Sequence, residues 1–172
     1  DKVNLIREGV DLYKQSASDI TGVAYDEVDK DLRFIFKVVN LSGIYGVGAV
    51  KMHSILTLGG VVKDINEVKN IVYAYRNANP DLVRAWGDAG DMLMAVKAGQ
   101  KYSMGADNII QSVPKEGMLK PNGMILGLPN LRKIATEDGR ESWVYDKKLG
   151  RNIIQEYIHP AKVFQRCIQS LA

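Results

Sequence analysis

Cysteine and histidine are scarce in this chain, and their scarcity excludes several kinds of site. The 172 residues include one cysteine, Cys167, so no intrachain disulfide can form and a reducing compartment is expected. The only histidines are His53 and His159. A structural zinc site needs about four Cys or His ligands at short spacings, and the sequence contains no such set. We therefore expect no metal site within the chain.

Long apolar runs are also missing. No stretch approaches the ~20 consecutive apolar residues that cross a bilayer, and no signal peptide opens the chain. Hydrophobic residues make up 46% and charged residues 25%, which is typical of a globular protein and excludes a disordered tail or a fibre. We therefore expect a cytoplasmic protein of ordinary domain size with no membrane partner.

Positive charge is only slightly in excess of negative charge. Lys and Arg number 23 and Asp and Glu number 20, which gives a formal net charge of +3. A balance this mild permits a nucleic-acid partner but does not require one, because the total does not say where the charges lie. The first residue is Asp rather than Met, so we expect the chain to be a piece of a longer protein.

The first two thirds of the chain have the apolar spacing of helices. Asp29 and Asp64 are expected N-caps, and Pro80 suits a first helical turn. Gly22 and Gly99 are expected to end the helices that precede them. Together these signals predict helices over residues 4–21, 29–45, 49–58, 64–79 and 80–99.

After Gly99 the pattern changes to short apolar runs separated by turn signals. A loop is expected over 136–141, and a final helix is expected from Pro160 to Ala172. The apolar runs predict strands over 109–113, 118–119, 124–128, 143–145 and 153–158. The predicted fold class is mainly α with a small antiparallel β element (α+β). We expect a helical region over 1–108 and a β-hairpin region with the final helix over 109–172.

One predicted helix, 29–45, carries a regular stripe made of Arg33, Lys37, Leu41 and Tyr45. Each step of four residues advances about 40° around the helix axis and about 6 Å along it, so the four form a slanting line. Two cations lie at one end and a tyrosine lies at the other. Such a line can bind phosphates at one end and offer an aromatic ring at the other, which matches the layout of a nucleoside triphosphate.

A simpler interpretation of the same helix competes with this one. Phe34, Val38, Leu41 and Tyr45 follow the spacing of an ordinary core stripe, with the two cations as solvated charges beside it. Spacing alone favours this core interpretation.

Three glycines, Gly43, Gly46 and Gly48, follow the stripe but match neither the P-loop nor the dinucleotide fingerprint. They follow a helix rather than a strand. A helix terminus that needs positive φ is the favoured explanation, and close approach of a ligand is the alternative.

The motif Arg33-x3-Lys37-x3-Leu41-x3-Tyr45-Gly46 resembles the fingers helix of family A DNA polymerases, the bacterial polymerase I and phage group. The resemblance covers nearly the whole chain, and its later blocks look like the phage branch. The further blocks, in order, are Asp11-Leu12-Tyr13, Gly22-Val23, Tyr75-Arg76-Asn77-Ala78-Asn79-Pro80, Leu119 to Gly123, Leu128-Pro129-Asn130-Leu131-Arg132 and Lys162 to Ala172. The resemblance implies a fingers core over 1–108, with 109–172 joining the fingers to the palm.

The resemblance also implies roles for single side chains. Lys37 would be the catalytic residue, which binds the incoming triphosphate and donates a proton to the departing pyrophosphate. Arg33 would contact the terminal phosphates, Leu41 the sugar and base, and Tyr13 the incoming nucleotide as well. A second set would contact template or primer DNA: Tyr45, Gly46, Arg132, Gln165, Arg166 and Gln169. Leu41 stands where bacterial members have an aromatic residue.

The implied function is that of a fingers fragment of a DNA-directed DNA polymerase, a nucleotidyltransferase of DNA replication that binds dNTPs and primer-template. Family members hold two Mg²⁺ ions with two aspartates, and we expect both aspartates to lie outside this chain. The chain alone is then expected to be inactive without the remaining palm and thumb. If it is phage-encoded, the expected location is the host cytoplasm. Two alternatives stay open: a non-catalytic helical DNA-binding module, or one subunit of a split polymerase.

Overall fold

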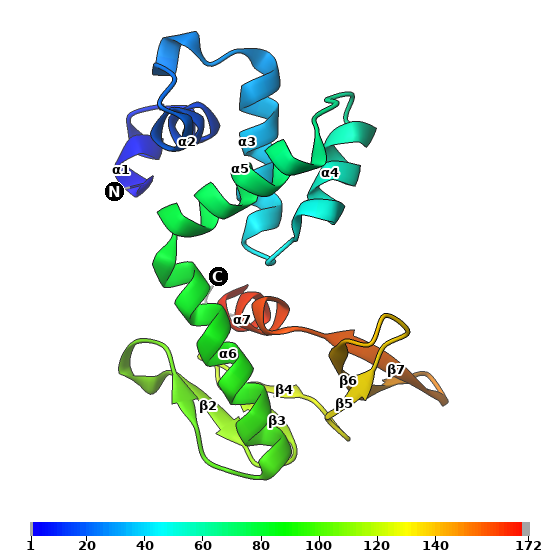
Figure 1. Cartoon of the computed structure of the whole chain (residues 1–172). Coiled ribbons are helices and arrows are strands. Elements are labelled where there is room, and N and C mark those ends of the chain that lie inside the picture. Colours follow the sequence, from blue (N-terminus) through cyan, green and yellow to red (C-terminus); the bar gives the residue numbers. More distant parts are fainter. Residues whose placement is uncertain (1, 170–172) are drawn as a thin grey trace. The chain divides into compact units, whose positions relative to one another are not determined.

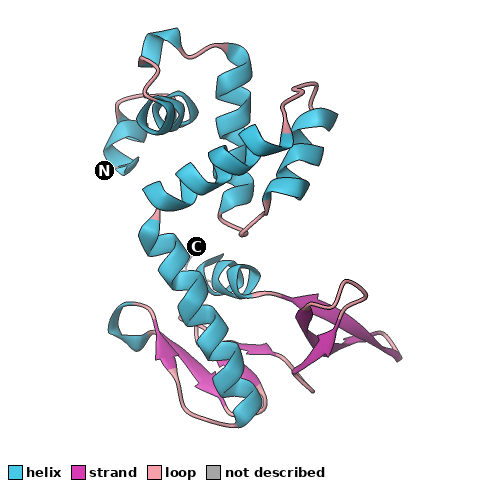
Figure 2. Cartoon of the chain, viewed as in Figure 1, coloured by secondary structure: helices cyan, strands magenta, loops and turns pink. Residues whose placement is uncertain are grey.

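The computed structural model describes residues 2–169, and within them it has seven α-helices and two small antiparallel sheets (Figure 1). The predicted α+β class is therefore confirmed. The chain divides into two compact units, residues 1–82 and 83–172. Figure 2 shows that the first unit is helical and that strands occur only in the second. The predicted end of the last helix, 170–172, lies outside the described residues.

Helices of the first unit begin where the sequence supplies a capping carboxylate. The side chain of Asp29 accepts a hydrogen bond from the Leu32 amide, and that of Asp64 accepts one from the Asn66 amide, which confirms both predicted N-caps. The helices are α1 (Lys2–Arg7), α2 (Leu12–Thr21), α3 (Lys30–Gly43), α4 (Ala49–Leu58) and α5 (Ile65–Ala78). A short 3-10 turn, η1 (Tyr25–Glu27), precedes α3.

The prediction of one continuous helix over residues 4–21 is wrong. Gly9 has a φ of 75°, a left-handed conformation that ends α1. Asp11 then starts α2, because its carboxylate accepts hydrogen bonds from the amides of Tyr13 and Lys14. The apolar spacing runs through both helices and therefore conceals the break.

The core of the first unit is formed by one face of α3 packed against the other helices. Ile35, Phe36 and Val39 of α3 are almost completely buried. At the end of the same face, a Cβ added to Gly43 would lie 2.5 Å from Cε1 of Tyr75, so the glycine allows α5 to pack this closely. This packing fixes which face of α3 remains on the surface.

Helix α6 (Pro80–Ala98) begins at the predicted Pro80, and most of it belongs to the second unit. One sheet has the order β1-β2-β3-β4, with strands Ser103–Met104, Ile110–Val113, Gly117–Leu119 and Ile125–Gly127. The other has the order β5-β6-β7, with strands Arg132–Ala135, Glu141–Leu149 and Asn152–Ile158. Helix α7 (Pro160–Ile168) follows β7, and His159 caps it.

The five predicted strands are confirmed in position, but the structure adds to them. β1 and β5 were not predicted, and β6 begins at Glu141 inside the expected loop. β5 alternates exposed and partly buried residues and contains two cations, so it lacks the apolar run on which the prediction depended. It is held by four paired residues on β6.

The core of the second unit lies between α6, α7 and the strands. Met92, Leu93 and Met118 are fully buried in it, together with Cys167. The Cys167 Sγ lies 4.0 Å from the Met118 Sδ. Burial raises the pKa of the Cys167 thiol to about 11.

Candidate nucleotide-binding site

The exposed face of α3 carries the predicted stripe. Helix α3 runs from Lys30 to Gly43, so Arg33, Lys37 and Leu41 lie on it and Tyr45 lies two residues beyond its end. The predicted helix 29–45 is thus slightly too long at both ends. Tyr45 belongs to a turn in which its amide donates to the Ser42 carbonyl.

The core interpretation of this stripe is right for two of its four residues. Phe34 and Val38 are partly buried and pack against the core of the first unit, whereas Leu41 is 51% exposed and Tyr45 is 39% exposed. The buried face of α3 is formed by Ile35, Phe36 and Val39. An exposed leucine and an exposed tyrosine on the side of two cations leave this face open to a ligand.

Arg33 is held in place by two residues at the start of α2. Its Nε donates to Asp11 Oδ2 at 2.5 Å, and its guanidinium carbon lies 5.5 Å from the centre of the Tyr13 ring. This arrangement uses Nε, and within the described residues the terminal nitrogens of Arg33 donate to no other protein group. The Arg33 fork is therefore pre-oriented and still has donors for an anion.

The carboxylate of Asp11 is stabilised in its charged form. Partial burial by itself would raise its pKa, but the hydrogen bond from Arg33 and those from the Lys14 and Tyr13 amides together lower the pKa below its usual range. Asp11 therefore stays ionised and keeps Arg33 in position at neutral pH. In the sequence Asp11 stands out only as part of the Asp11-Leu12-Tyr13 block, and its N-cap position is the signal that could have identified it.

Lys37 lies one turn further along α3 and is exposed. Within residues 2–169 its ammonium makes no hydrogen bond or ion pair with another side chain. A lysine with its charge uncommitted next to a pre-oriented arginine provides two different phosphate-binding groups on one helix face.

The turn after α3 explains one of the three glycines directly. Gly46 has a φ of 70°, so the helix-terminus explanation is confirmed there. Gly43 is needed for a different reason, which is its contact with Tyr75. Gly48 has a φ of −84° and serves as the N-cap of α4.

The expected template and primer contacts of the second unit lie on α7 and β5. Arg166 donates to Glu156 and to the hydroxyl of Tyr145. Arg132 donates to Asp146 and Gln155, so both arginines are committed to the sheet. Gln165 lies within α7, and Gln169 is exposed at its C-cap. All four residues belong to the second unit, whereas Arg33, Lys37, Leu41 and Tyr45 belong to the first.

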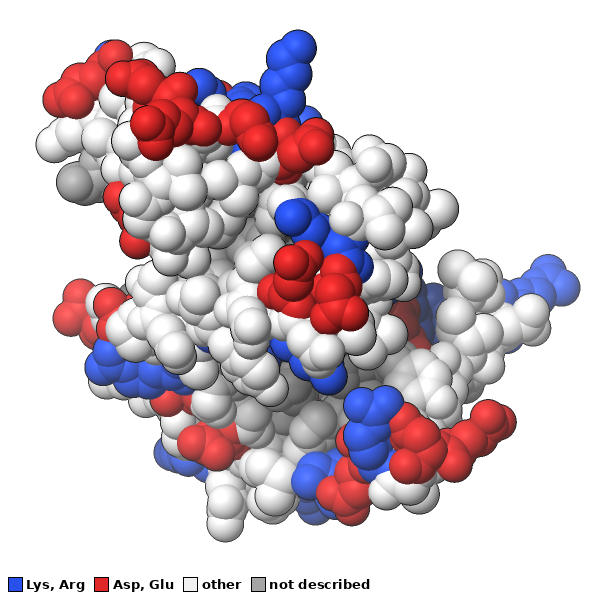
Figure 3. Space-filling model, turned by 45° about the horizontal axis from the view of Figure 1, so that its top comes forward, with Lys and Arg blue, Asp and Glu red and all other residues white. Residues whose placement is uncertain are grey.

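Acidic side chains gather near the beginning of α3. Five exposed acids, Asp19, Asp26, Glu27, Asp29 and Asp31, lie between the end of α2 and the first turn of α3. Figure 3 shows this concentration at the top of its view, over the segment that joins the two helices. Two of these acids flank Lys30 at the start of α3, and Arg33 and Lys37 follow it along the helix.

Residues 2–169 contain no group of three or more His, Cys, Asp or Glu side chains placed to hold a metal ion. None of the helices in the same part of the chain is both long enough and apolar enough to pass through a membrane. A scan against models of protein families and a search of curated proteins both find no match to this chain.

Proposed function

We propose that this chain is a fingers region of a family A DNA-directed DNA polymerase and that α3 binds the incoming dNTP. The observation that carries the proposal is the line Arg33, Lys37, Leu41 on α3, continued by Tyr45 in the next turn, in which Arg33 is half-buried and the other three are exposed. Its order of two cations, an apolar side chain and an aromatic ring follows the order of phosphates, sugar and base in a nucleotide. The sequence resemblance to the fingers helix supports the same assignment.

Arg33 and Lys37 would bind different parts of the triphosphate and have different roles. Arg33, oriented by Asp11, supplies a planar fork that suits two oxygens of a terminal phosphate. Lys37 supplies a mobile point charge and a proton at Nζ for the departing pyrophosphate. Both effects are positioning and electrostatic stabilisation, which dominate phosphoryl-transfer catalysis.

Mg²⁺ is the cofactor of such a polymerase, but the described residues do not fit it. They lack a cluster of acidic ligands for a metal ion, so no step is assigned to a metal on this chain. The proposal includes two partners, the primer-template and the remaining palm and thumb. It also includes a cytoplasmic location.

The acidic segment before α3 favours a nucleotide site over a non-catalytic DNA-binding module. A surface that follows a DNA backbone needs several cations in a row. Helix α3 carries three, Lys30, Arg33 and Lys37, and acids adjoin Lys30 at the helix start. This short set suits a triphosphate better than a continuous duplex backbone.

The test is a titration of the chain with dATP, followed by hydrogen exchange in α3 and the turn at Tyr45. We expect protection of this segment, and we expect Lys37→Ala to weaken binding about tenfold or more, because a charge-assisted hydrogen bond to phosphate is lost. Lys51→Ala removes an exposed lysine from α4 of the same unit and should leave binding unchanged.

Two results would contradict the proposal. One is equal weakening by Lys37→Ala and Lys51→Ala, which would mean that dATP is attracted by general positive charge. The other is tight, salt-dependent binding of duplex DNA with no effect of dATP on α3, which would identify the DNA-binding module instead. We also expect no primer extension by the chain alone, and extension that survives Lys37→Ala would refute the assigned role of Lys37.

A further inference from the structure

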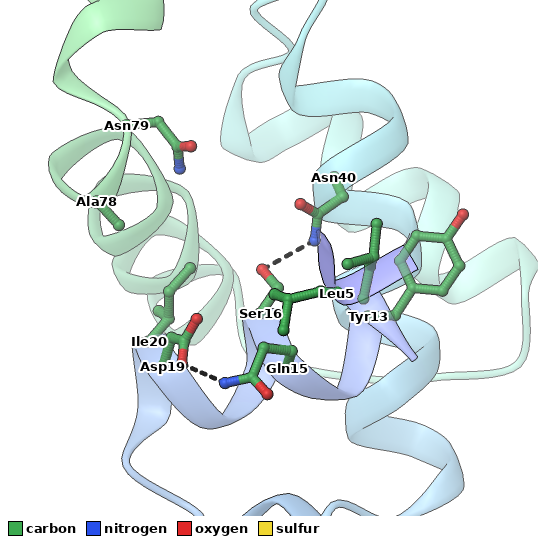
Figure 4. Close-up of a pocket in the computed structure, with 10 residues that line it drawn as sticks. Leu5, Tyr13, Gln15, Ser16, Asp19, Ile20, Asn40, Ala78 and Asn79 are labelled. Atoms are coloured by element: carbon green, nitrogen blue, oxygen red, sulfur yellow. Dashed lines mark hydrogen bonds between the residues drawn. The ribbon is translucent and has the colours of Figure 1, made fainter. Parts of the chain in front are cut away.

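A pocket lined by α1, α2, α3 and the end of α5 adjoins the proposed nucleotide site, which does not account for it (Figure 4). Tyr13 is shared, because it lines the pocket and its ring centre lies 5.5 Å from the guanidinium carbon of Arg33. It encloses about 180 Å³. A cavity of about 150 Å³ holds a benzene-sized molecule, so the space fits one small ring with a substituent.

The orientation of the amides in this pocket is fixed by their partners. Asn40 Nδ2 donates to the Phe36 carbonyl at 2.8 Å, and Asn79 Nδ2 donates to the Tyr75 carbonyl at 2.7 Å. Gln15 Nε2 donates to Asp19 Oδ1 at 2.7 Å. Because each of these partners can only accept, these contacts assign the nitrogens, and the amide oxygens remain together with one N–H each on Gln15 and Asn79.

The pocket is therefore rich in acceptors. The amide oxygens of Asn40, Asn79 and Gln15 receive no hydrogen bond within the described residues, and neither does the second oxygen of Asp19. On the donor side there are the hydroxyl of Ser16, which accepts from Asn40 Nδ2 at 2.9 Å, and one remaining N–H each on Gln15 and Asn79. A ligand that pairs with the four unfilled oxygens must bring donors, and the negative charge of Asp19 favours a cation among such ligands.

The remaining lining is apolar and the one charged group is negative. Leu5, Leu12, Ile20 and Ala78 supply the walls, and Asp19 supplies a carboxylate at the rim. Apolar walls with a few convergent polar groups are typical of small-molecule sites. Phosphates and carboxylates are disfavoured here, since they would face acceptors and a like charge.

We propose that this pocket binds a small planar organic cation, with an amidinium or guanidinium group directed at Asp19, Asn40 and Asn79 and an apolar body against the walls. The planar fork of such a group supplies several donors at once, which matches several converging acceptor oxygens. Apart from Tyr13, the pocket uses different residues from the nucleotide site, so the proposal stands whether or not α3 binds dNTPs.

The test uses benzamidine as the probe, titrated into the whole chain while the side-chain amide resonances of Asn40 and Asn79 are followed by NMR. We expect saturable shifts of both amides. Benzamide, which has nearly the same shape but no positive charge, should bind at least about fivefold more weakly. Equal binding of the two compounds would overturn the assigned charge, and the absence of saturable shifts at these amides would overturn the site.

Two variants make the result specific. Ala78→Leu adds volume to the wall without removing any polar partner, and it should abolish binding while leaving the far-ultraviolet circular dichroism unchanged. Asp19→Asn should weaken benzamidine about fivefold and leave benzamide unaffected. Asp26→Asn is the matched control, because it removes an exposed acid outside the pocket and should change neither ligand. Unchanged benzamidine binding by Ala78→Leu would refute the pocket as the location.

The same chemistry can come from a free compound or from an arginine side chain of a peptide, and a second titration separates them. N-acetyl-arginine amide carries the guanidinium on a flexible chain with peptide groups at its base. Tighter binding of this compound than of benzamidine identifies a peptide arginine as the source, and weaker binding identifies a free ring-bearing cation. Failure of both to produce saturable shifts overturns the proposal.

Discussion

Asp11 shows how one side chain can serve two structures. One of its oxygens caps α2 and the other binds Arg33. Because asparagine is about as good an N-cap as aspartate, a single substitution can separate the two roles. The consequence can be measured as stability and as nucleotide binding in the same variants.

We expect Asp11→Asn to lower the free energy of unfolding by about 0.5–1 kcal/mol, because it removes a partly exposed ion pair and keeps the cap. Asp11→Ala removes both and should cost about 1 kcal/mol more. Urea denaturation measures both values. Equal losses in the two variants would show that the cap contributes nothing to stability, and no loss in Asp11→Asn would show the same of the ion pair with Arg33.

At the residue scale the sequence identified the cations of the site but not what holds them. Arg33 and Lys37 follow from their spacing of four on one helix, which is a local property. The contact between Arg33 and Asp11 joins residues 22 positions apart, so no local pattern contains it. The same limit applies to the pocket, whose amides come from three helices.

At the scale of elements, the close approach of α3 and α5 depends on Gly43. Alanine is normally the better helix residue, by about 0.5–1 kcal/mol. At Gly43 the added Cβ would meet the Tyr75 ring at 2.5 Å, and that ring is buried and cannot move aside freely. Packing therefore reverses the usual preference.

We expect Gly43→Ala to destabilise the protein by about 1–3 kcal/mol through overpacking. Gly87→Ala is the control, since Gly87 lies within α6 and its added Cβ meets nothing within 4 Å, and it should stabilise by up to about 1 kcal/mol. Thermal unfolding of the two variants checks the signs. Stabilisation by Gly43→Ala would mean that α5 can shift away without loss.

Glu156 links three elements of the second unit. It lies on β7 and pairs with Lys147 of β6 at 2.7 Å and with Arg166 of α7 at 3.0 Å. The hydrogen bond from Lys147 is the main cause that lowers its pKa to about 2, and Arg166 adds to it against a smaller opposing effect of burial. An unfolded glutamate has a pKa near 4.3, so the native state holds the charged form more firmly.

The sign of the pH dependence follows from this lowered pKa. The stabilisation by Glu156 is fully present above about pH 4.3 and is lost as the pH falls towards 2. We expect Glu156→Gln to lower the free energy of unfolding by about 1 kcal/mol at pH 7, with a smaller difference at pH 3. Urea denaturation at the two pH values measures it, and a difference that does not shrink would assign the effect to packing rather than charge.

Elements were easier to predict from sequence than their limits. Helices with clear ends, such as α5 between Asp64 and Asn79-Pro80, have their signals inside their own sequence. The break between α1 and α2 also has local signals, Gly9 and Asp11, but the continuous apolar spacing hides it. The strand β5 depends on pairing with β6, which lies outside its own segment.

At the scale of the whole molecule, each unit has its own hydrophobic core. Packing places most of α6 with the strands of residues 83–172, whereas the functional division at residue 108 remains a prediction. The net charge of +3 likewise does not predict binding, because it does not show where the charges lie. Acidic residues gather before α3, and Arg33 and Lys37 follow within the helix.

Because Cys167 is buried, its rate of labelling can measure how often the core of the second unit opens. A thiol with a pKa of about 11 that is shielded from water reacts with a disulfide reagent only when its surroundings open, so the labelling rate reports the frequency of that opening. We expect Val163→Ala, in the same core, to accelerate labelling about fivefold for each kcal/mol lost. Val39→Ala, in the other core, should leave the rate unchanged, and an equal acceleration would show that the two cores open together.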